Sequence, residues 1–365
     1  MRTAVDKKHS HEIINDDNKV SMTNFLSKSE KSGLPTFTQT NHCEVCNSSE
    51  LISLYPMEMM FGNEGPFLYV HCQACGSTYQ PEKLTDYSKY YSDSYYSFQY
   101  KEPNTFKSQL RKLKRKLRNR YYYFSTGLIG RILAFMRPKP INHLSHHITL
   151  RLDMEILEIG SGSGELLHEI AELGVKKVMG IDPFIPKETL YKNNARVYKA
   201  CIDQLNDIFN EQKFDLIMFN HSLEHSPTPF EDLHKVTKFL KRDGEILLRF
   251  PVSGSKLSEH YGENWWSLDA PRHVYLFSSR SVEILAKKCD LKVKRTHYEG
   301  TIDDYLASEQ HLSGIPLLSE YSYIVNTKQL KFTSEQLSQF QNEIEIQNKL
   351  GTAAQAGFIL GCKNL

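Results

Sequence analysis

Three glycines at alternate positions separate an apolar run from a helical pattern. Residues 156–167 read ILEIGSGSGELL, and a second apolar run, residues 177–181, ends in Asp182. Glycine is needed at such a turn because the backbone bends tightly and a side chain would block the approach of a nucleotide to the helix start. A carboxylate at the end of the second run can accept hydrogen bonds from both hydroxyls of a ribose. Together these features predict a site for an adenosine-containing ligand.

The spacing of the glycines and the charge beside them distinguish two classes of cofactor. Dinucleotide sites use GxGxxG and offer a helix N-terminus to a pyrophosphate. This turn reads GxGxG and has Glu158 two residues before it. A carboxylate repels a pyrophosphate but suits the ammonium and sulfonium groups of S-adenosylmethionine (SAM). The pattern therefore favours SAM.

Short apolar runs alternate with helical patterns from Met154 onward, which predicts a parallel sheet flanked by helices. In this setting the sequence resembles the class I SAM-dependent methyltransferases over roughly residues 150–290 and the last strand. EIGSGSG resembles the first motif of that family, GID its ribose-binding acid, and FDLIMFNHSLEH its fourth strand and following turn. The resemblance implies an α/β, Rossmann-like, seven-stranded and mostly parallel sheet.

The same resemblance implies the cofactor, SAM, and the residues that bind it. The adenine-flanking position falls at Ile202 and Asp203, although the spacing around residues 201–207 permits several registers, and the methionine end falls at Asn220 and His221. The full predicted set is Glu158, Gly160, Ser161, Gly162, Gly164, Asp182, Ile202, Asp203, Asn220 and His221.

Two predicted loops at the carboxyl ends of strands carry histidines, and ligands of open parallel sheets bind at such loops. The first contains His221 and His225, and the second contains His273. A hydroxyl acceptor must lose its proton on methylation, and histidine is a natural base near neutral pH. We predict these three as candidate catalytic bases. The alternatives are capping or packing for His225 and packing against the sheet for His273.

The second loop, residues 265–278, also holds both tryptophans of the chain. It resembles the Pro-Arg-His block, followed by an aromatic residue and Ser, of methyltransferases that act on small molecules or glycans. Under that resemblance Trp265 or Trp266 stacks on an acceptor ring, and Arg272 holds a carboxylate or phosphate. Packing of the block against the sheet is the alternative.

Cysteines form two CxxC pairs near the start of the chain, Cys43 with Cys46 and Cys72 with Cys75. Four thiolates at this spacing close a tetrahedral zinc site without an open position, so we expect a structural zinc, with iron as the less favoured alternative. CxxC, CxxCG and a YY-containing stretch before a methyltransferase domain resemble bacterial methyltransferases of sugar and cell-surface polysaccharide synthesis. This implies a sugar, nucleotide-sugar or lipid-linked saccharide acceptor.

The expected organisation has four parts: a disordered polar tail (1–40), a zinc-ribbon module (41–82), a tyrosine-rich connector with a basic helix (83–150), and the methyltransferase domain (151–365) with an insert at about 302–350. The chain has a net charge of only +2 and no apolar run long enough to span a bilayer, so we expect a cytoplasmic protein. The oligomeric state is left open.

The basic helix carries no acidic residue over residues 107–120. It either pairs with acids elsewhere or contacts an anionic surface such as the inner face of a membrane. A nucleic-acid methyltransferase is a second hypothesis, disfavoured because residues 214–229 lack an Asp/Asn-Pro-Pro-aromatic turn and no Pro-Cys nucleophile occurs. A non-catalytic SAM-binding protein is a third.

Overall fold

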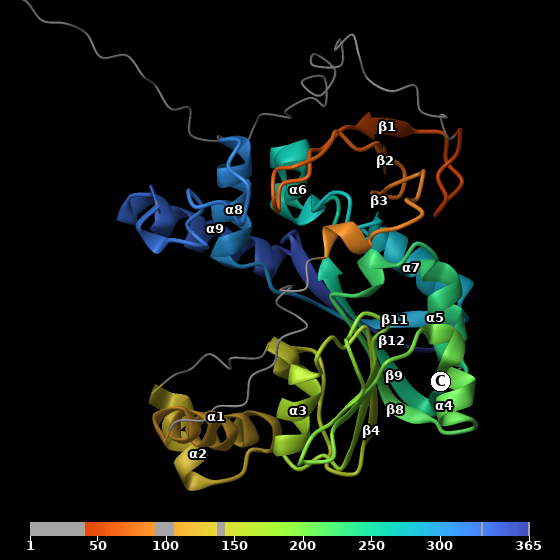
Figure 1. Ribbon diagram of the computed structural model, residues 1–365, viewed down its shortest axis with the longest axis vertical. Coiled ribbons are helices and arrows are strands. Elements are labelled where there is room, and N and C mark those ends of the chain that lie inside the picture. Colours follow the sequence, from red (N-terminus) through yellow and green to blue (C-terminus); the bar gives the residue numbers. More distant parts are fainter. Residues whose placement is uncertain (1–40, 92–105, 137–142, 330, 364–365) are drawn as a thin grey trace, which may run out of the picture. The chain divides into compact units, whose positions relative to one another are not determined.

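The computed structural model describes residues 41–91, 106–136, 143–329 and 331–363. The tail expected at residues 1–40 lies outside this part of the chain. The remainder contains an eight-stranded sheet, a smaller four-stranded sheet and the helices around them (Figure 1).

The large sheet has the strand order β11-β12-β9-β8-β4-β5-β7-β6. Neighbours from β9 to β7 are parallel, whereas β11, β12 and β6 each pair antiparallel with the next strand inward. The predicted α/β fold is confirmed, but the predicted count of seven strands is wrong. The additional strand is β6, a two-residue edge strand too short to produce an apolar run. The strands are β4 Glu155–Ile159, β5 Lys177–Ile181, β6 Thr189–Leu190, β7 Arg196–Tyr198, β8 Phe214–Asn220, β9 Leu240–Pro251, β11 Leu291–Tyr298 and β12 Gln355–Cys362.

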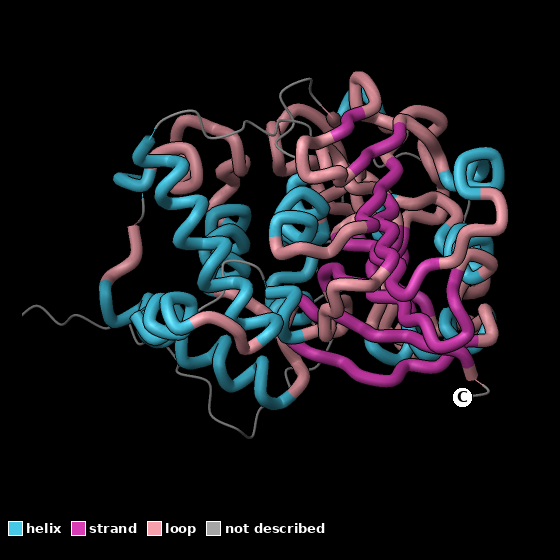
Figure 2. The backbone as a smooth tube through the Cα atoms, turned by 90° about the horizontal axis from the view of Figure 1, so that it is seen from below, coloured by secondary structure: helices cyan, strands magenta, loops and turns pink. Residues whose placement is uncertain are grey.

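Alternate residues of each strand point to opposite faces of this sheet, and both faces are buried under other parts of the chain. Leu157 of β4 packs into one apolar cluster and its neighbour Ile156 into the other. Helix α3 lies on one side of the sheet, and α4 and α5 lie on the other (Figure 1), so the strands form a continuous layer between helices (Figure 2). The flanking helices are α3 Glu165–Glu172, α4 Leu205–Phe209, α5 Pro229–Thr237 and α7 Ser279–Lys288.

The small sheet joins the cysteine-bearing segment to the later chain. Strands β1 (Leu51–Leu54), β2 (Tyr69–Cys72) and β3 (Thr78–Tyr79) are antiparallel, and β10 (Tyr275–Leu276) pairs with β3. The small sheet formed by the segment 41–82 therefore gains its fourth strand from two residues that follow His273 in the chain.

The remaining helices lie before and within the strand sequence. Residues 106–136 form a helical hairpin, which confirms the long helix predicted from Phe106, and the predicted insert between β11 and β12 is helical as well. The bounds are α1 Phe106–Phe124, α2 Leu128–Met136, α6 Lys256–Tyr261, α8 Ile302–Leu312 and α9 Ser334–Leu350, with short 3-10 turns η2 Ser88–Tyr90, η4 His143–His146, η5 Ile202–Gln204, η6 Leu223–His225, η7 Gly262–Asn264, η8 Trp266–Leu268 and η9 Thr327–Gln329. In the described residues, no helix is long and apolar enough to cross a membrane.

Candidate active site

The glycine turn follows β4 and leads into α3. Gly160, Gly162 and Gly164 have φ angles of 70°, 53° and 83°, in the left-handed region that favours glycine. A Cβ atom on Gly160 would lie 2.6 Å from the Ser222 Cβ, and one on Gly164 would lie 2.4 Å from a Val197 methyl carbon. The predicted need for glycine is therefore explained at these two positions by both conformation and space.

Asp182 follows the neighbouring strand β5 and contacts the glycine turn. Its Oδ2 accepts a hydrogen bond from the Gly162 backbone N–H at 2.8 Å, and its Oδ1 accepts one from Phe184 N–H at 2.8 Å. Ser161 is held at the same place because its N–H donates to Ile181 O at 3.1 Å. Burial raises the pKa of Asp182. The structure thus brings together the turn and the acid that the sequence predicts.

Glu158 is buried beside this pair. Its Oε2 has no hydrogen-bond partner among the described residues. Burial, and secondarily the charge of Asp182, raises the pKa of Glu158 to about 8. The free protein therefore holds a carboxyl group that is mostly protonated at neutral pH, and one of its oxygens is available for a further partner.

A row of polar side chains continues from Asn220 across the carboxyl ends of β8 and β9. Arg249 donates to Asn220 Oδ1 at 2.9 Å and also pairs with Glu299. Glu299 lies 3.2 Å from His147 Nε2 in turn. Burial acts to raise the pKa of Glu299, but the neighbouring His147 and the charge of Arg249 hold it at about 2. The row links the predicted methionine end of SAM to a second cavity.

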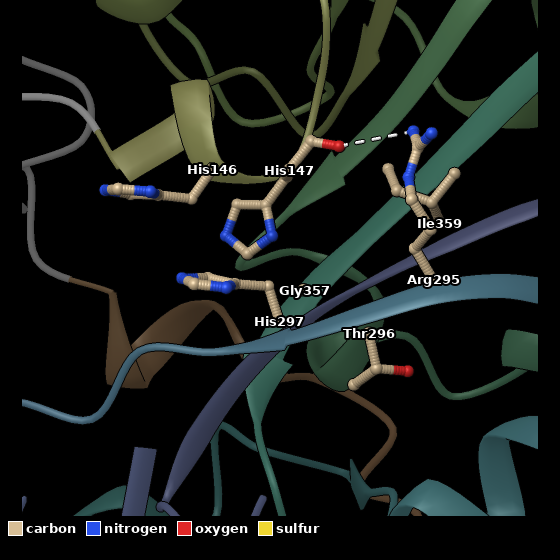
Figure 3. Close-up of a pocket in the computed structure, with 7 residues that line it drawn as sticks. All are labelled: His146, His147, Arg295, Thr296, His297, Gly357 and Ile359. Carbon is tan, nitrogen blue, oxygen red and sulfur yellow. Dashed lines mark hydrogen bonds between the residues drawn. The ribbon is translucent and has the colours of Figure 1, made fainter. Parts of the chain in front are cut away.

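That cavity, of about 330 Å³, lies between η4 and the strands β11 and β12 (Figure 3). Its lining includes three histidines, and the rings of His146 and His297 stack with centroids 5.0 Å apart. The sequence did not predict this group, because the His146-His147 pair is a weak local signal and His297 is far along the chain. The lining residues are His146, His147, Arg295, Thr296, His297, Gly357 and Ile359.

Of the three histidines predicted as bases, His221 and His225 follow β8, and His273 lies in the loop before β10. His221 has a positive φ of 53°, and its Nδ1 lies 3.5 Å from an oxygen of Glu224. The rings of His225 and His273 lie with centroids 4.7 Å apart. Burial, and secondarily His273, lowers the pKa of His225 to about 4. The structure therefore brings all three histidines to one end of the sheet, with Glu224 among them.

Arg272 is buried completely and lies between two carboxylates. Its guanidinium is 2.9 Å from Glu58 and 2.5 Å from Asp269. Trp265 is also buried, and Trp266 donates its indole N–H to Asp304 at 3.0 Å. A substrate anion would have to displace one of the carboxylates of Arg272, so its position favours a structural role over the predicted substrate contact.

The adenine-flanking positions lie on η5. Ile202 packs against the core cluster, whereas the Asp203 side chain is 71% exposed and pairs with Lys235 of α5 at 2.5 Å. Asp203 thus points to solvent and to α5, and Ile202 is the one of the two that offers an apolar contact.

The four cysteines of the CxxC pairs converge. Their sulfur atoms lie within 4.8 Å of one another, with Cys43 and Cys75 3.7 Å apart and Cys46 and Cys72 3.6 Å apart. The Ser278 hydroxyl donates to the Cys75 carbonyl, so the cluster is tied to the start of α7. Four thiols in one place offer a donor set suited to zinc.

Comparisons with known proteins match the region of the chain that holds these residues. A family model described as a methyltransferase domain matches residues 126–296. Ribosomal protein L11 methyltransferase of Thermosipho africanus is 32% identical over 130 residues, which cover 32% of this chain and 48% of that protein. Ubiquinone biosynthesis O-methyltransferase of Salmonella paratyphi A is 22% identical over 183 residues, which cover 48% of this chain and 69% of that protein.

Among solved structures, a SAM-dependent methyltransferase from Archaeoglobus fulgidus aligns with a TM-score of 0.35 and 18% identity, over 68% of this chain and 92% of that chain. The chain spans about half the length of the Thermosipho relative. The family model matches residues 126–296 as a methyltransferase domain, in agreement with the predicted enzyme class. SAM is the cofactor of this class.

Proposed function

We propose that the protein transfers a methyl group from SAM to a small-molecule or glycan acceptor. The observation that carries this proposal is the Asp182 carboxylate held against the Gly162 N–H, next to a glycine turn in which side chains would not fit. The glycine turn with Asp182, and the oxygen of Glu158 that has no hydrogen-bond partner among the described residues, both suit a cationic adenosine compound.

Each group around the turn has a separate task in this proposal. Asp182 would accept hydrogen bonds from the ribose hydroxyls, and Ile202 would contact the adenine. Glu158 and Asn220 would bind the methionine end. SAM supplies a methyl group on a positively charged sulfur, which is an activated donor. The chain then has to orient the acceptor and take up its proton, and His221, with its side chain 34% exposed, is the most accessible of the three candidate bases.

The cavity of Figure 3 supports a polar acceptor. Gly357 pairs with Arg249, which pairs with Asn220, so the cavity lies about 10 Å from the methionine end at the ordinary strand spacing. Three histidines and Arg295 line it, which suits an acceptor with hydroxyl or phosphate groups. A sugar, a nucleotide sugar or a lipid-linked saccharide meets this requirement.

Zinc in the four-cysteine cluster is a further part of the proposal. The cluster would hold a structural ion that stabilises the segment 41–82, and the connector 83–150 and the domain 151–365 would follow it. The closed set of sulfur ligands supports a structural rather than catalytic ion.

A membrane surface is the proposed location of the acceptor, and α2 is the element that supports it. Five of its nine residues are large, apolar and exposed, and Phe135 reaches 89%. Lys112 and Arg115 of α1 pair with Glu172 and Glu169 of α3, so part of the basic helix faces the domain. The exposed residues are Leu128, Ile129, Ile132, Phe135 and Met136. This revises the predicted contact of residues 107–120, because α2 would supply the apolar insertion and exposed Lys114 and Arg131 the charge.

The test has two parts. Calorimetry of the purified protein with SAM and with NAD should show micromolar binding of SAM alone. Labelled SAM is then offered with nucleotide sugars, lipid-linked saccharides and structured RNA. Transfer to a saccharide is expected. Transfer to RNA would favour the nucleic-acid alternative, and SAM binding without transfer to any acceptor would favour a non-catalytic protein.

The membrane contact is tested separately by sedimentation with vesicles that contain anionic lipid. Phe135→Ser is expected to reduce the bound fraction several-fold, whereas Leu318→Ser, an exposed leucine outside the hairpin, should not. Equal binding by the two variants would contradict the contact.

A further inference from the structure

A second group of metal-binding side chains lies beside the methyltransferase site. One carboxylate oxygen of Glu224 and one ring nitrogen each of His225 and His273 lie within 4.8 Å of one another. Neighbouring ligands of a tetrahedral ion with bonds of about 2.1 Å lie about 3.4 Å apart. A small rotation of one side chain would therefore bring all three atoms into range of a single ion.

The hydrogen bonds of the two histidines prepare both rings for this role. Nδ1 of His225 lies 2.9 Å from the carbonyl oxygen of Arg272, and Nδ1 of His273 lies 2.8 Å from that of Ser267. A carbonyl oxygen only accepts, so each Nδ1 carries the proton and each Nε2 keeps its lone pair. Metal-binding histidines are typically held in this way, with the second nitrogen donating to a carbonyl or carboxylate.

Glu224 supplies the independent observation. It is fully buried, and neither carboxylate oxygen has a hydrogen-bond donor among the described residues. Nδ1 of His221 lies 3.5 Å from Oε1. A buried carboxylate is costly without compensation. A bound cation would supply the missing partner.

We propose that Glu224, His225 and His273 bind one divalent transition-metal ion. Two imidazoles and one carboxylate suit zinc or ferrous iron and leave coordination positions open. An open position would accept an oxygen of the acceptor, a role that rests on the proposed function. Ion binding itself does not rest on it. The assignment makes His225 and His273 ligands and leaves His221 as the base.

The test is a cobalt titration of full-length protein that carries one equivalent of zinc, followed by absorption and by metal analysis. Cobalt in the four-cysteine cluster gives thiolate charge-transfer absorption, whereas cobalt on nitrogen and oxygen ligands does not. We expect one equivalent of cobalt per chain without that absorption. His225→Gln, His273→Gln and Glu224→Gln should each weaken its binding at least tenfold, and His260→Gln, an exposed histidine on α6, should not.

Cobalt uptake below one equivalent, or uptake unchanged in the three folded variants, would overturn the site. Thermal denaturation shows whether each variant is folded, and the conservative Glu224→Gln provides a readout if a histidine variant is not. SAM calorimetry on the same samples separates the two proposals: retained SAM binding without the cobalt site removes only the metal, whereas a cobalt site without SAM binding removes only the proposed function.

Discussion

The Asp182 carboxylate accepts a hydrogen bond from the backbone N–H of Gly162 at 2.8 Å, across the gap between the ends of two parallel strands. The bond fixes the acid opposite the glycine turn before any ligand arrives. Asp182→Ala should weaken SAM binding about 10- to 100-fold, because one hydrogen bond to a charged group is worth about 1.5–3 kcal/mol. Calorimetry measures this. Asp153→Ala, at an exposed acid, is the control, and equal affinities would remove Asp182 from the site.

Two glycines with the same backbone conformation allow the effect of backbone strain to be distinguished from the effect of steric crowding. Gly160 and Gly314 have φ angles of 70° and 72°, but only at Gly160 would a Cβ meet another atom, the Ser222 Cβ at 2.6 Å. Gly160→Ala and Gly314→Ala should both lose about 1 kcal/mol of stability from the left-handed conformation. Only Gly160→Ala should also lose SAM affinity, by at least tenfold. If both variants bind SAM as the wild type does, the turn does not contact the cofactor.

Glu158 should make the stability of the free protein depend on pH. Its pKa rises from an ordinary value of 4.5 to about 8 on folding, chiefly through burial. The folded state then binds more protons than the unfolded state between these values, so stability is fully present below about pH 4.5 and is lost as the pH rises to about 8.

Glu158→Gln should remove this dependence and raise the unfolding free energy at pH 8 by on the order of 3 kcal/mol, while it weakens SAM binding. Urea denaturation across this pH range checks the first expectation. The affinity of the wild type for SAM should increase up to about pH 8, because the cation binds the carboxylate form. Glu165→Gln, at an exposed acid, should behave as the wild type, and a flat profile in the wild type would contradict the assignment.

Arg272 offers a choice between a structural and a substrate-binding role. Arg272→Ala would leave Glu58 and Asp269 without their shared cation, and breaking a buried ion pair costs about 3–5 kcal/mol. We expect a clear loss of melting temperature, with no such loss for Arg242→Ala at an exposed position. An unchanged melting temperature with a raised KM for the acceptor would restore the substrate contact.

Removal of the proposed zinc ion should affect residues outside the segment 41–82. Strand β10 pairs with β3, and Ser278 bonds to the Cys75 carbonyl, so loss of the ion should expose the backbone of residues 275–278. Hydrogen exchange before and after treatment with a chelator measures this. Cys201→Ser, at an exposed cysteine outside the cluster, should leave metal content unchanged. Protection unaffected by the chelator would show that the cluster stabilises only itself.

The sequence by itself determined the features that depend on a few neighbouring residues. A left-handed turn between a strand and a helix requires glycine at given positions, and the next strand ends in Asp182, so the cofactor pocket is readable from local pattern. The two CxxC pairs are readable for the same reason, because each places two thiols on one short turn. The alternation of apolar runs with helical patterns also predicted the α/β class, although β6 was too short to form a recognisable apolar run.

Only the tertiary structure decided which distant residues meet. His225 and His273 come together because β10 pairs with β3 beside η6, and Arg272 is buried because Glu58 comes from the cysteine-bearing segment. The row from Asn220 to His147 depends on β12 lying between β9 and β11, an order that no local period encodes. Such contacts follow from how strands pair across long stretches of chain, and burial then sets the charge of each group. The sequence therefore supplied the candidates, and packing determined which of them lie together and which are buried within the fold.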